Sequence, residues 1–148
     1  MAEVINLAEG FKKFCENSGY EHNWEEFKKL YLDPNKKNLE PLLKLNFLWK
    51  AGIKSLFKKT SLSPYKAIFK RLDDWEYPER VLETVRKSEA AVGRKIPARI
   101  NLFFTLGGVV DGVTVYHDGI PHIYIGLDYP EDRQEYFDLV AAHEIGHA

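Results

Sequence analysis

The chain has 148 residues, 45% of them hydrophobic and 29% charged, which is enough for one or two compact units with a buried core. Its formal net charge of −1 provides no overall field to attract nucleic acid or an anionic membrane. The one cysteine, Cys15, excludes an internal disulfide and a cluster of thiolate zinc ligands. Because no secretion signal or membrane-spanning apolar run is recognisable, we expect a soluble, cytoplasmic protein that binds neither nucleic acid nor a membrane.

The first two thirds of the chain show apolar residues at three- and four-residue steps, the spacing of one helix face. The predicted helices run from Val4 to Cys15, Asn23 to Asp33, Asn38 to Leu56, Ser63 to Leu72 and Pro78 to Val92. Asn23 and Glu26 form a capping-box pattern, and Gly93 is a typical left-handed helix stop. We therefore predict that residues 1–95 form a helical lobe.

After Pro97 the apolar residues alternate with other side chains, which is typical of strands. The predicted strands are Arg99–Thr105, Val113–Tyr116 and His122–Leu127. Asp118-Gly119, between the last two, is a strong hairpin signal. A final helix is expected after Pro130, with Glu131 and Asp132 in its first turn, and should continue to the last residues. The sequence thus predicts an α+β fold, with residues 96–148 forming a small sheet and a helix.

This last helix carries the sequence HEIGH, residues 143–147, which is an H-E-x-x-H motif. Positions i and i+4 of a helix lie on the same side with a rise of about 6 Å, so His143 and His147 can share one metal ion. Neutral imidazole suits Zn²⁺, whose catalytic sites take three protein ligands and keep one position open. Glu144 is placed to act as a general base on metal-activated water and then as an acid toward the leaving amine.

A short surface helix with two incidental histidines is the simplest alternative explanation of the motif. Its three specified residues should coincide by chance in well under about one in a hundred chains of this length. The motif also lies on a predicted helix that follows a hairpin, and the small apolar residues 140–142 precede it, as a buried helix requires. The pattern therefore favours a zinc hydrolase.

Through HEIGH, the preceding LVAA and the hairpin from Val113 to Leu127, the chain resembles the zincin metallopeptidases. Its helical first half resembles, more loosely, the uncharacterised bacterial predicted zinc-dependent proteases. The resemblance implies a mixed sheet backed by the motif helix, as in the upper subdomain of zincins. It also implies an antiparallel edge strand, here Val113, Thr114, Val115 and Tyr116, to which a peptide or protein substrate adds by strand pairing.

The third zinc ligand of zincins is a Glu or His downstream of the motif, and here one residue follows His147. Upstream candidates are His117, Asp118, His122 and Asp128, for which turn and strand roles are the better interpretation. We therefore expect the chain to be the N-terminal part of a longer peptidase, inactive as it stands and binding zinc loosely.

Two other classes of function remain open at this point. The chain could be a non-catalytic module that binds a protein partner through its helical half, with the motif left as a remnant on a core helix. Alternatively, its paired lysines could contact nucleic acid, although solvated helix faces explain them better. Neither substrate specificity nor the oligomeric state follows from the sequence.

Overall fold

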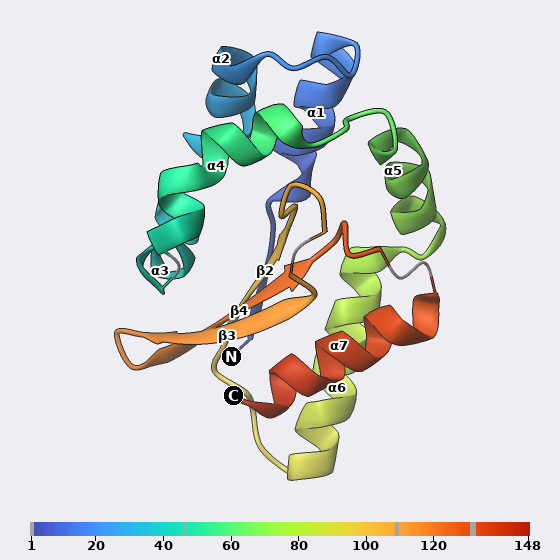
Figure 1. The fold of residues 1–148 in the computed structure, drawn as a ribbon. Coiled ribbons are helices and arrows are strands. Elements are labelled where there is room, and N and C mark those ends of the chain that lie inside the picture. The colour runs from blue at the N-terminus through green and yellow to red at the C-terminus, as the bar shows by residue number, and fades with distance from the viewer. Residues whose placement is uncertain (1, 46, 109, 131–132) are drawn as a thin grey trace.

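A four-stranded sheet with the strand order β1-β2-β4-β3 forms the centre of the fold (Figure 1). The computed structural model describes residues 2–45, 47–108, 110–130 and 133–148. The strands are β1 (Glu3–Asn6), β2 (Arg99–Phe103), β3 (Gly112–His117) and β4 (Ile120–Gly126). β1 pairs with β2 and β2 with β4 in parallel, whereas β3 and β4 form an antiparallel hairpin. The sheet is therefore mixed, and β3 is one of its edges.

Helices make up most of the remainder, and the predicted α+β class is confirmed. They are α1 (Ala8–Ser18), α2 (Trp24–Phe27), the π-helical η1 (Lys28–Leu32), α3 (Lys36–Leu45), α4 (Phe47–Lys59), α5 (Tyr65–Asp74), α6 (Tyr77–Val92) and α7 (Gln134–Gly146). Helices α1 to α4 are grouped together, away from α6 and α7, which pack against each other (Figure 1). α7 contacts both β3 and β4, so the motif helix backs the hairpin side of the sheet.

The prediction of a helix from Val4 is wrong, because Glu3–Asn6 is an edge strand. Val4 pairs with Ile100 and Asn6 with Leu102, and α1 begins at Ala8. The Asn6 side chain accepts a hydrogen bond from the Ala8 backbone N–H, which helps to start the helix. A segment of four residues with two apolar side chains, Val4 and Ile5, is compatible with either structure, and the pairing with β2 decided the outcome.

The predicted helix from Asn38 to Leu56 is also wrong in its extent. α3 begins at Lys36, so Asn38 lies inside the helix rather than at its cap, and α4 is a separate helix. Apolar residues recur at helical spacing through both segments, so periodicity alone predicted a single helix. The predicted acidic first turn of the last helix, Glu131 and Asp132, lies outside the described residues, and α7 begins at Gln134.

Three predictions made from short sequence patterns are confirmed: a helix N-cap, a helix stop and a hairpin turn. The Asn23 side chain accepts a hydrogen bond from the backbone N–H of Glu26, as a helix N-cap does. Gly93 ends α6 with a φ of 70°, and Asp118 and Gly119 take φ values of 52° and 75° between β3 and β4. Two consecutive positive φ values are those of a type I′ hairpin turn.

An aromatic core joins the helices to the sheet. Phe11 of α1 is fully buried and stacks on Phe104, which follows β2, with ring centroids 4.7 Å apart. The buried Tyr31 hydroxyl donates to the Phe104 carbonyl and accepts from its N–H.

The division into two units, residues 1–95 and 96–148, stays a prediction. β1, Phe11 and Tyr31 of the first unit all contact the second unit. Within the described ranges, no helix has both the length and the apolar character needed to cross a membrane.

Candidate metal centre

The two motif histidines meet at the C-terminal end of α7. The Nε2 atoms of His143 and His147 are 3.2 Å apart, and their rings are nearly perpendicular, with centroids separated by 4.8 Å. Both side chains are exposed, since they project from the last turn of the helix. The helical spacing predicted to bring these two imidazoles together does so.

This separation can be compared with the spacing that a zinc ion demands. Two nitrogens bound at about 2.0–2.1 Å and at a tetrahedral angle lie about 3.3–3.4 Å apart. The observed 3.2 Å is within about 0.2 Å of that value. The same distance also suits a hydrogen bond between one protonated and one unprotonated ring nitrogen. The pair therefore fits zinc and is equally satisfied as a hydrogen-bonded pair of imidazoles.

Glu144, between the histidines, is turned toward the sheet. Its side chain is buried, with 7% of its surface exposed, and its Oε2 accepts a hydrogen bond of 2.7 Å from the Thr114 hydroxyl. A Cβ atom on Gly112 would stand 2.7 Å from the Glu144 Cγ. The absence of a side chain at Gly112 thus lets β3 approach α7 closely enough for this contact.

A second hydrogen bond connects the edge strand to the end of the helix. The Tyr116 hydroxyl donates to the His147 carbonyl oxygen over 2.6 Å. The last carbonyls of a helix have no partner within the helix, so this bond supports the turn that holds His147. Thr114 and Tyr116, predicted only as parts of a substrate-binding strand, both contact the motif helix.

An open groove of about 480 Å³ runs beside the motif. It is lined by Asp111, Gly112, Tyr136, Leu139, Val140, His143 and Glu144. Sequence reasoning missed Asp111, Gly112, Tyr136 and Leu139 as site residues. The one available signal was the Asp-Gly pair just before a predicted strand, since glycine in such a position often marks a close approach of backbone to another element.

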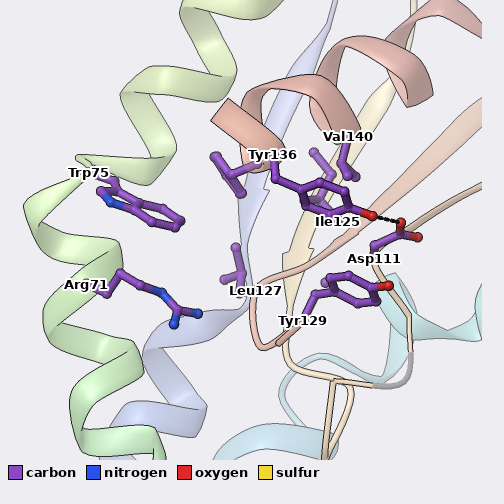
Figure 2. Close-up of a pocket in the computed structure, with 10 residues that line it drawn as sticks. Arg71, Trp75, Asp111, Ile125, Leu127, Tyr129, Tyr136 and Val140 are labelled. Atoms are coloured by element: carbon purple, nitrogen blue, oxygen red, sulfur yellow. Dashed lines mark hydrogen bonds between the residues drawn. The ribbon is translucent and has the colours of Figure 1, made fainter. Parts of the chain in front are cut away.

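A smaller cavity of about 20 Å³, the space of a single water, lies next to the groove and shares three of its residues (Figure 2). Between the two, the Tyr136 hydroxyl donates a hydrogen bond of 2.9 Å to Asp111 Oδ2. The Tyr129 ring stacks on the Tyr136 ring at 5.5 Å. The hydrogen bond to Asp111 is the main cause that raises the pKa of Tyr136 above its ordinary value, because it stabilises the neutral, donating form of the hydroxyl.

The upstream candidates for a third ligand do not join the two histidines. His117 and His122 lie together on the hairpin, with ring centroids 5.5 Å apart, and Asp118 is 3.3 Å from His117. Asp128 is buried and accepts hydrogen bonds from the Tyr65 and Thr105 hydroxyls, at 2.6 and 2.8 Å. Among the described residues, no three His, Cys, Asp or Glu side chains gather in a way that could hold a metal ion.

Comparison with models of known protein families, with curated proteins and with solved structures yields no match. The resemblance to zincins therefore depends on the residues of this chain alone.

Proposed function

We propose that this chain contributes part of the active site of a zinc-dependent metallopeptidase, in which His143 and His147 are two of the metal ligands and Glu144 is the catalytic base. The observation that carries the proposal is the Nε2–Nε2 separation of 3.2 Å, close to that of two ligands on one tetrahedral zinc ion. The site also has the expected neighbours, a buried carboxylate and the strand that ends the sheet among the described residues.

Glu144 is arranged for proton transfer. Its Oε2 is occupied by the Thr114 hydroxyl, whereas no described residue donates to Oε1. Oε1 can therefore take a proton from an attacking water and later give it to the nitrogen of the leaving amine. Bound zinc would supply Lewis acidity, polarising the substrate carbonyl and making water a better nucleophile at neutral pH.

The peptide would bind along β3. Among the described residues this strand pairs with β4 alone and is an edge of the sheet, so alternate backbone N–H and C=O groups along Val113, Thr114, Val115 and Tyr116 are available to a further strand. Strand addition provides affinity through main-chain hydrogen bonds and places the substrate beside Glu144. The Thr114–Glu144 hydrogen bond connects this strand directly to the base.

The proposal requires a third ligand from outside the described residues, since none of them groups with the two histidines. With two ligands, zinc binding should be loose, with a dissociation constant of micromolar order or weaker. Once a third ligand completes the set, affinity should rise and hydrolysis of peptide bonds becomes possible.

Zinc titration of the chain tests the proposal directly. Isothermal titration calorimetry should show one zinc ion bound to the wild-type chain, and His143→Ala and His147→Ala should each abolish that binding. His117→Gln is the matched control, because His117 belongs to the other histidine pair and should leave the binding unchanged. Binding that survives loss of His143, or that depends on His117, would refute the proposed metal centre.

Glu144→Gln separates catalysis from metal binding. In a form of the protein that contains the third ligand, this variant should keep its zinc and lose peptide hydrolysis, because an amide cannot accept the proton. A zinc-free protein with no hydrolytic activity would instead support the alternative of a non-catalytic protein-binding module, in which α7 serves only to pack against β3.

A further inference from the structure

We propose that the groove beside Glu144 receives a basic side chain of the peptide substrate, lysine or arginine, and that the Asp111 carboxylate binds its cationic end. This inference rests on the proposed peptidase function and adds a substrate class to it. Gly112 connects the two sites: it follows Asp111 in the chain, and a Cβ atom added to it would meet the Glu144 side chain. A side chain in the groove would therefore belong to a residue next to the peptide bond that Glu144 acts on.

The Asp111 carboxylate is held in place and still has capacity for a ligand. Its Oδ2 accepts from the Tyr136 hydroxyl at 2.9 Å (Figure 2). Its Oδ1 accepts from the Gly112 N–H at 2.7 Å. Each carboxylate oxygen has two lone pairs, so each can accept one more hydrogen bond. A cationic group in the groove can thus bind without displacing either existing partner.

No cation of the described chain neutralises this carboxylate. Asp111 is half-buried, and none of the described lysines, arginines and histidines forms an ion pair with it. Arg71 lines the far side of the small cavity, where its guanidinium lies over the Trp75 ring at 5.3 Å (Figure 2). A partly desolvated carboxylate without a counter-charge favours a ligand that brings a positive charge.

The remaining wall of the groove suits the aliphatic part of such a side chain. Leu139 is 64% exposed and Val140 lies next to it on α7, so both can contact methylene groups. Lysine and arginine place their stems along apolar surface while the charged end makes polar contacts. An acidic side chain would be repelled by Asp111 and Glu144, and a purely apolar one would cover Asp111 without pairing with it.

Binding of peptides to the full chain tests the inference without requiring hydrolysis. Short blocked alanine peptides with a central lysine, acetyl-lysine, norleucine or glutamate would be titrated while the backbone amide NMR signals of Gly112 and Leu139 are followed. The lysine peptide should bind about two- to fivefold more tightly than the acetyl-lysine peptide, the gain expected of a partly exposed ion pair. Added salt should reduce this advantage.

Asp111→Asn should remove the preference, because the amide keeps partners for the Gly112 N–H and the Tyr136 hydroxyl but carries no charge. Glu135→Gln is the matched control, since it removes an equal charge from the exposed start of α7 and should preserve the preference. Equal binding of the lysine and acetyl-lysine peptides by the wild-type chain would overturn the inference whether or not Asp111→Asn folds.

The two proposals fail in different ways. Zinc bound through His143 and His147 without any lysine preference would refute the groove assignment alone. A lysine preference that depends on Asp111, in a chain that binds no zinc through these histidines, would refute the peptidase proposal and leave a site for basic peptides.

Discussion

The Thr114 hydroxyl donates a hydrogen bond of 2.7 Å to Oε2 of Glu144, which joins the edge strand of the sheet to the candidate base on α7. Glu144 is buried, and this is its one side-chain hydrogen bond to a described residue. A buried carboxylate depends on such donors, because burial removes most of its hydration. The contact therefore orients Glu144 and contributes to the packing of α7 on β3.

Thr114→Val should reveal the strength of this contact. Valine keeps the shape of threonine but leaves the Glu144 carboxylate without its donor, so the free energy of unfolding should fall by about 1–3 kcal/mol. Urea unfolding followed by circular dichroism measures the change. Thr114→Ser retains the hydroxyl and should recover most of the loss. If the valine variant were as stable as the wild type, the hydrogen bond would not matter for stability.

Gly112→Ala should disturb the same contact by steric overlap. The added Cβ would lie 2.7 Å from the Glu144 Cγ and 3.0 Å from the Val140 Cγ1, so β3 and α7 would have to move apart. Overpacking of this kind typically costs about 1–3 kcal/mol. Gly146→Ala is the control on α7, because a Cβ there meets no atom within 4 Å and alanine favours a helix. Equal thermal stability of the two variants would contradict the close approach at Gly112.

Asp128→Asn should destabilise the protein through the network around that buried carboxylate. Asp128 accepts hydrogen bonds from the Tyr65 hydroxyl and from both the backbone N–H and the hydroxyl of Thr105. An amide offers one acceptor oxygen in place of two and turns an N–H group toward donors, so we expect a loss of about 1.5–3 kcal/mol. Tyr65→Phe, which removes one of the donors, should cost less. Chemical denaturation of both variants checks this order, and the reverse order would contradict it.

Alkaline pH should weaken the fold through groups buried in their neutral form. Burial raises the pKa of the Cys15 thiol from 9.0 to about 12, and burial likewise raises that of Tyr124 from 10.0 to about 12. Between the unfolded and folded pKa values, the unfolded chain has lost a proton that the folded chain retains. The stability from Cys15 is therefore complete below about pH 9 and is lost as the pH rises toward 12, by at most about 1.4 kcal/mol per pH unit.

Urea titrations at a series of pH values between about 8 and 11 measure this loss. Cys15→Ala should show a shallower decline than the wild type, because one of the titrating groups is gone, whatever its stability at neutral pH. The thiol itself should react slowly with a disulfide reagent in the folded chain and rapidly once the chain is unfolded. Rapid modification under native conditions would contradict a buried, neutral Cys15.

The sequence by itself determined the features that depend on neighbours a few residues apart. The pairing of His143 with His147 follows from the helical repeat, and the turn at Asp118-Gly119 follows from the backbone freedom of those residues. Gly93 ended α6 for the same kind of local reason. Each of these depends on one turn of helix or one tight turn, so its physical cause lies within a few consecutive residues.

The tertiary structure decided what depends on residues far apart in the chain. Val4 lies in a strand because it pairs with Ile100 of β2. The hydrogen-bond donor to Glu144 is Thr114 of β3, thirty residues away in the chain. Likewise, Asp111 accepts a hydrogen bond from Tyr136. Asp128 accepts one from Tyr65 and does not lie with the motif histidines. Side-chain periodicity carries no information on which distant surfaces will meet, because those contacts are chosen by the packing of the whole core and sheet.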